Sequence, residues 1–272
     1  MTDTNRDTRM PVLFVSHGAP TLAVEDDEAH RFLAGLGDRL GKPGAILMVS
    51  AHYEAPEPTV TAAEHPETIH DFGGFPRELY EIRYPAPGNP ALADTVAGLL
   101  RDAGWPARTD RSRGLDHGAW VPLLLMYPEA DVPVVQLSID SRQGAEYHYR
   151  LGELLRPLRD QGVLIVGSGG VTHNLRLYFG ARPDDPPSDR VRGFAEWVAK
   201  RIAADRRDDL VRYRSRGPDA AHNHPTEEHF VPLLTALGAS EPGEATVRLH
   251  TSHTHGALML DAYLFGAGEL AA

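Results

Sequence analysis

Cysteine is absent from all 272 residues of the chain. Its absence excludes disulfide bonds, thiolate metal sites, iron–sulfur clusters and cysteine nucleophiles together. Any metal ion must therefore be held by histidine and carboxylate side chains. Histidine is well represented, with 14 copies in this length, so the positions of these rings become the main source of functional information.

Long apolar runs and an excess of positive charge are also absent. No stretch approaches the roughly 18 apolar residues of a membrane-spanning helix, and the polar segment 1–10 lacks the apolar region of a signal peptide. With 27 Lys and Arg against 38 Asp and Glu, the formal charge is −11. This balance argues against binding to nucleic acid or to a membrane surface. We expect a cytoplasmic protein with neither kind of partner.

Aliphatic and β-branched runs alternate with segments of helical periodicity along the chain. The runs predict strands at 11–16, 45–50, 132–139, 162–168, 246–250 and 258–265. The periodic segments predict helices at 25–40, 89–103, 143–160 and 188–204, and a further helix that begins at Thr226. We therefore expect an α/β fold with a central, mostly parallel or mixed sheet flanked by helices. Residues 1–10 would be a flexible tail, and residues 11–272 a single catalytic domain.

Four histidines lie in unusual local contexts. His17, His52 and His173 each follow a predicted buried strand, and His229 falls in the first turn of the helix predicted from Thr226. Side chains that follow parallel strands meet at one edge of the sheet, and neutral imidazole is a common ligand for zinc, iron and copper. The pattern predicts a mononuclear metal site. The alternative for each ring is a histidine that only caps a strand.

Two further segments carry polar groups beside aromatic ones. His117 lies between Asp116 and Gly118, and a carboxylate beside an imidazole is a plausible acid/base unit. A buried turn histidine is the alternative. The segment 70–76 (HDFGGFP) places Asp71 beside Phe72 and Phe75, a combination suited to lining a pocket for an aromatic substrate.

Three other motif interpretations fail on spacing. The stretch GSGG at 167–170 lacks the lysine of a phosphate-binding loop and the Gly-x-Gly-x-x-Gly spacing of a dinucleotide site. It also lacks the Gly-x-Ser-x-Gly arrangement of a hydrolase nucleophile elbow. The cluster of His222, His224 and His229 is not a His-Glu-x-x-His protease motif.

Seven stretches together make the sequence resemble the class III extradiol ring-cleavage dioxygenases of the LigB type, in the 4,5-DOPA dioxygenase branch. They fall in order and span nearly the whole chain: SHGAP at 16–20, SAHYE at 50–54, HDFGGFP at 70–76, YPAPG at 84–88, GLDHGAWVP at 114–122, GSGGVTHN at 167–174 and EHFVPL at 228–233.

The resemblance implies that His17, His52 and His229 ligate one divalent metal ion, with His173 as a fourth ligand or as the catalytic base. The wider family uses two histidines and one carboxylate, and His229 stands here in place of that carboxylate. Fe(II) would be the working ion, and Zn(II) a plausible bound one.

The implied substrates are a small aromatic diol and O₂. His173 would take the diol proton, and His117 with Asp116 would steady the second hydroxyl or the bound oxygen. Trp120, Phe72, Phe75 and Tyr84 would form the pocket walls, with ordinary core packing as the alternative for each.

Other functions remain open at this point. Three histidines with Glu54 or Glu228 as general base would also suit a zinc-dependent hydrolase. A non-enzymatic metal-binding interaction module of the same fold is another possibility, as is a metal whose role is mainly structural.

Overall fold

The computed structural model describes residues 9–266, so the first eight residues of the expected tail lie outside the described part. Arg9 and Met10 belong to the body of the molecule. The amide of Met10 donates to the carbonyl of Arg159 at 3.0 Å, and Arg9 forms an ion pair with Glu241 at 3.1 Å. These two residues are therefore not part of the expected tail.

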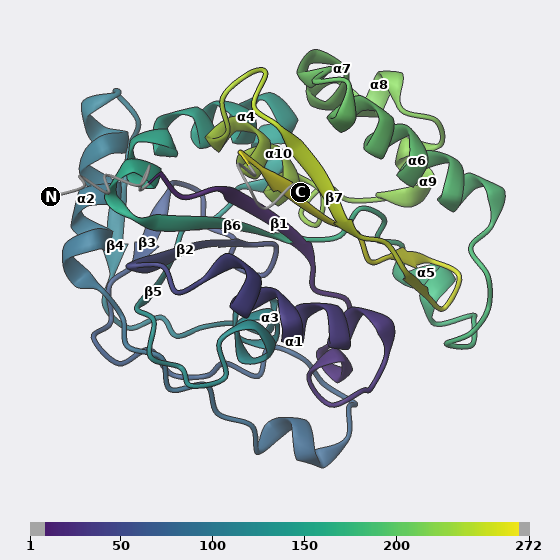
Figure 1. Ribbon diagram of the computed structural model, residues 1–272, viewed down its shortest axis with the longest axis horizontal. Coiled ribbons are helices and arrows are strands. Elements are labelled where there is room, and N and C mark those ends of the chain that lie inside the picture. The colour runs from purple at the N-terminus through teal and green to yellow at the C-terminus, as the bar shows by residue number, and fades with distance from the viewer. Residues whose placement is uncertain (1–8, 267–272) are drawn as a thin grey trace, which may run out of the picture.

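A six-stranded mixed sheet in the order β5–β2–β6–β1–β10–β7 forms the centre (Figure 1). Its strands are β1 Val12–Ser16, β2 Ala45–Ser50, β5 Val134–Gln136, β6 Val163–Gly169, β7 Thr246–His250 and β10 Ala262–Phe265. The first four in this order are parallel to one another. β10 and β7 add an antiparallel edge, so the predicted sheet is confirmed in its mixed form.

Helices cover both faces of this sheet. The longer ones are α1 Glu28–Leu40, α2 Pro90–Asp102, α3 His117–Met126, α4 Gly144–Leu155, α6 Asp189–Ala203 and α10 Val231–Ala239. The short ones are α5 Leu175–Tyr178, α7 Arg207–Val211, α8 Tyr213–Arg216 and α9 Ala220–Asn223. The described part also contains four 3₁₀ turns: η1 Pro20–Ala23, η2 Arg77–Tyr80, η3 Ser141–Gln143 and η4 Arg156–Gln161. It contains two small strand pairs as well, β3 Thr59–Thr61 with β4 Arg108–Asp110 and β8 His253–Thr254 with β9 Leu258–Met259.

Alternation along the central strands divides the core in two. In β1, Val12 and Phe14 pack with the helices α2, α4, α6 and α10, whereas Leu13 and Val15 pack with α1 and α3. Figure 1 shows α4 and α10 on one side of the sheet and α1 and α3 on the other. Both faces are covered, which is why the central strands are continuous aliphatic runs.

Several predicted boundaries differ from the structure. Asn89 and Ser188 cap their helices as expected, each accepting a bond from a first-turn amide. The helix predicted from Thr226 begins only at Val231. The strand predicted at 258–265 is split into β9 and β10. None of the helices within residues 9–266 is long and apolar enough to cross a bilayer.

Candidate metal centre and active site

His17 and His52 leave the sheet at the same edge because their strands are both parallel to β6. The register pairs Ser16 with Gly169 and Ser50 with Ser168. The rings then turn toward one another, and their Nε2 atoms lie 3.0 Å apart. The sequence prediction that these strand ends meet is confirmed.

His229 reaches the same point from the turn before α10. Its carbonyl accepts a bond from the amide of Gly170 at 2.8 Å. A side chain at Gly169 would exclude this approach, since a Cβ there would lie 2.2 Å from the same carbonyl oxygen. As a result, one ring nitrogen from each of His17, His52 and His229 falls within 4.8 Å of the others.

Outer hydrogen bonds orient two of these rings. Ser168 Oγ donates to the carbonyl of Gly118 at 2.5 Å, so it accepts from His17 Nδ1 at 2.9 Å. The carboxylate of Glu228 accepts from His229 Nδ1 at 3.1 Å. Protons on both Nδ1 atoms leave the Nε2 lone pairs free, the usual arrangement around a bound metal.

Burial keeps the three rings neutral. It lowers the pKa of His17 and His229 well below the usual value, and the neighbouring histidines lower it further. Burial, followed by the charge of His117, lowers the pKa of His52 to about 3. The Nε2 atoms of His17 and His52 lie within hydrogen-bonding distance of each other, so lone pairs on both can be directed at one cation. The residues therefore fit a divalent metal ion.

His173 lies beside this group. Its ring stacks on that of His229, with centroids 3.4 Å apart and planes 8° from parallel. Its backbone amide donates to the carbonyl of Asn223 at 2.9 Å, which ties the loop after β6 to α9. A nitrogen of His173 lies close to His229 and Glu228, but His173 is not in the group formed with His17 and His52.

The carboxylate partner of His117 is Asp71. Asp71 accepts from His117 Nδ1 at 3.0 Å and from its backbone amide at 2.9 Å. Burial alone would raise the pKa of Asp71, but the hydrogen bonds and charge of His117 bring it to about 2. The expected pairing with Asp116 is wrong. Asp116 caps α3 and accepts from Ser50 Oγ at 2.6 Å.

A cavity of about 180 Å³ opens above the histidines. It is lined by Gly18, Ala19, Pro20, His52, Phe72, Phe75, His117, His173, Leu175, Tyr178, Phe179, His229 and Leu258. Phe72 and Phe75, two of the expected wall residues, are among them. Leu175, Tyr178 and Phe179 form a wall that the sequence did not indicate, since α5 is too short to show a periodic pattern.

Two expected wall residues do not line the cavity. Trp120 is fully buried, and its indole donates to the carbonyl of Ile69 at 2.9 Å. Tyr84 is also fully buried, with its hydroxyl donating to the carbonyl of Tyr127 at 3.1 Å. Trp120 packs behind Phe72, their ring centroids being 6.3 Å apart, and therefore supports the wall.

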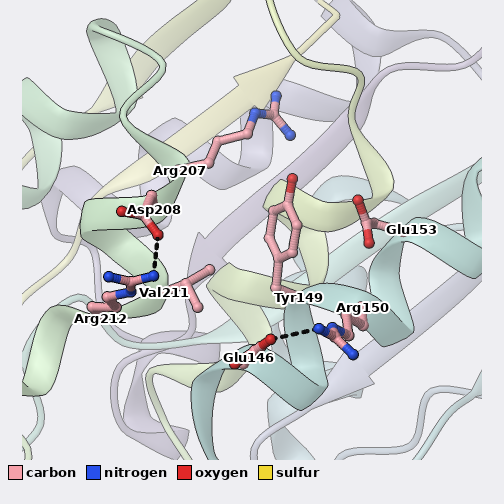
Figure 2. A pocket seen from close by; sticks show the side chains of 8 residues that line it. All are labelled: Glu146, Tyr149, Arg150, Glu153, Arg207, Asp208, Val211 and Arg212. Carbon is pink, nitrogen blue, oxygen red and sulfur yellow. Dashed lines mark hydrogen bonds and ion pairs between the residues drawn. The ribbon is translucent and has the colours of Figure 1, made fainter.

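A second cavity, of about 330 Å³, lies between α4 and α7 (Figure 2). Two ion pairs join residues of its lining. Arg150 pairs with Glu146 at 2.7 Å, and Arg212 pairs with Asp208 at 3.2 Å. It brings no histidine or nucleophile together, so the histidine-lined cavity is the candidate active site.

Comparisons with known proteins agree with this site. Residues 11–262 match the family model described as the catalytic LigB subunit of aromatic ring-opening dioxygenase. A "4,5-DOPA dioxygenase extradiol" from Beta vulgaris is 40% identical over 96% of this chain and 98% of its own length. A protein of the same name from Escherichia coli is 45% identical over 85% of this chain and 86% of its own length.

A solved structure gives the same result for the fold. The crystal structure of an uncharacterised protein from Escherichia coli K12 superposes with a TM-score of 0.80 and 37% identity, covering 95% of this chain and all of that one. The mixed sheet and the three histidines gathered at one of its edges define an α/β protein with a candidate metal site. The chain belongs to the LigB family and is an extradiol, aromatic ring-opening dioxygenase.

Proposed function

We propose that the chain opens the ring of a catechol with O₂, using Fe(II) held by His17, His52 and His229. The observation that carries this proposal is the convergence of nitrogens from His17, His52 and His229 beside an aromatic-walled cavity that His52 and His229 line. Fe(II) bound there would supply the coordination of both diol oxygens and the activation of O₂. The names of the relatives make 3,4-dihydroxyphenylalanine a first substrate to test.

His173 is proposed as the base that takes the proton of a diol hydroxyl. It lines the cavity, and its ring lies parallel to that of His229 rather than converging with His17 and His52. Two ligands of one ion ordinarily point their nitrogens at a common centre. The stacked arrangement therefore favours proton transfer over coordination as the role of His173.

His117 is proposed to hold the second hydroxyl through Nε2. Asp71 binds both Nδ1 and the backbone amide of His117, which fixes the ring orientation and the tautomer. Asp71 itself does not line the cavity. We therefore assign it a positioning role in place of the direct substrate contact expected from the sequence.

The zinc-hydrolase alternative has less support, because both expected general bases are engaged. Glu228 accepts from His229 Nδ1. Glu54 accepts from Ser141 Oγ at 2.5 Å and does not line the cavity. Neither carboxylate is placed to activate a water above the three histidines.

Anaerobic reconstitution tests the proposal. Metal-free protein is loaded with Fe(II) or Zn(II), and catechol is added before O₂. The iron form should consume one O₂ per ring opened and give a yellow product, and His173→Ala should retain iron while losing turnover. Iron-loaded protein that consumes no O₂ with any catechol, while the zinc form hydrolyses esters, would refute the proposal.

A further inference from the structure

The walls of the active-site cavity are almost entirely apolar. Its polar lining residues are the four histidines at the floor, His52, His117, His173 and His229, and the hydroxyl of Tyr178. Phe72 and Phe75 form one aromatic part of the wall, and residues of α5 form another. Within residues 9–266, no Lys, Arg, Asp or Glu lines this cavity.

Large apolar side chains stand exposed at its rim. Phe179 is 78% exposed and Leu175 is 46% exposed, and both line the cavity. The two residues lie one helical turn apart, since the amide of Phe179 donates to the carbonyl of Leu175 at 3.0 Å. An exposed apolar pair beside a catalytic cavity is a surface that an apolar ligand can cover.

The position of this pair is fixed from two directions. Asn174 caps α5 through the amide of Arg176 at 3.1 Å, and its side-chain amide donates to the carbonyl of His222 at 2.6 Å. Tyr178 packs on His255, with ring centroids 4.0 Å apart. Figure 1 shows α5 beside the β8–β9 hairpin that carries His255. We call Leu175, Tyr178 and Phe179 the α5 wall. These contacts hold the wall in place, and it follows His173 closely in the sequence.

Building on the proposed catechol cleavage, we propose that the α5 wall selects catechols with an apolar ring substituent over catechols with an amino-acid side chain. An alkyl substituent that points away from the four histidines would contact Leu175 and Phe179 and remove their side chains from water. A carboxylate or ammonium group in the same place would lose part of its hydration without gaining a charged partner in the lining.

The expected size of the preference follows from the contact area. Each methylene moved from water onto apolar surface is worth about a fourfold change in affinity when it is fully buried. For a three-carbon substituent on a partly open wall, we expect a preference of about tenfold or more over a zwitterion of similar length.

The test compares 4-propylcatechol, 3,4-dihydroxyphenylpropionate, dopamine and 3,4-dihydroxyphenylalanine on the iron-loaded protein. The kcat/KM of each ring opening is measured, together with Kd by calorimetry under nitrogen, where no turnover occurs. The propyl compound should lead in both quantities by about tenfold or more. Equal or better binding and turnover of the zwitterion would overturn the inference.

Variants at the rim locate the effect. Phe179→Ala should lower the ratio of kcat/KM between 4-propylcatechol and unsubstituted catechol, and Phe179→Arg should favour the propionate instead. Val24→Ala is the matched control, because Val24 is 44% exposed, similar to Leu175, and does not line the cavity. Ratios that do not change in the Phe179 variants would also count against the α5 wall.

The proposed ring opening and the proposed selectivity of the α5 wall would be refuted by different results. If unsubstituted catechol is not opened either, the proposed reaction is wrong, and the anaerobic Kd values still decide whether the wall prefers apolar substituents. If catechol is opened but the four substituted compounds react and bind alike, the reaction stands and the selectivity is refuted.

Discussion

Acidification should destabilise the metal-free protein through His224, a ring that no proposed step uses. His224 is fully buried beside Phe230, with ring centroids 5.0 Å apart. Its Nε2 donates to the carbonyl of Val171 at 2.8 Å, and its Nδ1 has no partner within the described residues. Protonation would therefore place a charge on a buried atom that faces no acceptor.

The magnitude follows from the pKa. Burial lowers the pKa of His224 from its usual 6.5 to about 3, although the bond to Val171 acts in the opposite direction. Because the folded-state pKa is the lower one, the unfolded chain binds more protons as the pH falls below the usual value. The stability is complete above about pH 6.5 and falls on acidification, by about 2 kcal/mol at about pH 5.

Urea unfolding of wild type and His224→Phe measures the contribution of His224 to the free energy of unfolding. Both proteins are metal-free, with a chelator present. The variant leaves the carbonyl of Val171 without its donor, so at about pH 7.5 it should be less stable by about 1–3 kcal/mol. That difference should shrink by about 2 kcal/mol at about pH 5. The other buried histidines are common to both proteins.

The control is His65→Gln, a substitution at an exposed ring, which should change the free energy of unfolding by no more than about 0.5 kcal/mol. Parallel stability profiles for wild type and His224→Phe would refute the reasoning, because they would show that His224 takes up no proton on unfolding.

Three further predictions concern the metal centre. His52→Ala should lower metal content at equal protein concentration while circular dichroism shows the fold intact; unchanged metal content would contradict the ligand assignment. Asp71→Asn should lower kcat by about 10–100-fold with the metal retained, because His117 loses the charged partner that orients it; unchanged kcat would assign Asp71 no positioning role. Gly118→Ala should weaken metal binding by about tenfold or more, because the added Cβ would lie 3.0 Å from His52 Cδ2. The control Gly98→Ala, where the added Cβ meets open space, should bind metal as the wild type does.

The strand-end histidines could be predicted because two local signals coincide there. Continuous aliphatic runs mark strands that are buried on both faces, and His17 and His52 follow such runs directly. Parallel strands of one sheet end at the same edge, so the prediction of a parallel sheet was enough to place these rings at one edge, although β6 lies between β1 and β2. The rotation of the His17 ring depends on Ser168 and that of the His229 ring on Glu228, and no local pattern indicates those contacts.

The partner of His117 was missed for a geometric reason. Asp116 and His117 are adjacent in sequence, but Asp116 is the N-cap of α3 and directs its carboxylate to the amide of Ala119. Consecutive residues at a helix start do not face each other. Asp71, the actual partner, comes from a loop 46 positions earlier, a relation that only the tertiary structure brings about.

The helix α3 was missed because it is buried on nearly every side. It contains nine buried residues and Pro122 within its ten positions, so it shows neither a polar face nor an uninterrupted helical pattern. Amphipathic periodicity identifies helices at the surface of a core, as in α1 and α2, and is silent for one enclosed by it.

That enclosed helix explains how the fold tolerates the metal centre. The three proposed ligand rings come from separate parts of the chain and meet at one point only because the surrounding structure holds them there. Gly118 on α3 accepts from Ser168, which in turn fixes His17. Asp116 at the same helix start holds Ser50, whose hydroxyl accepts from the amide of His52. The buried helix α3 therefore preorganises two of the three proposed ligands, and metal binding should stabilise the fold by an amount that grows with the logarithm of the ratio of free metal concentration to Kd.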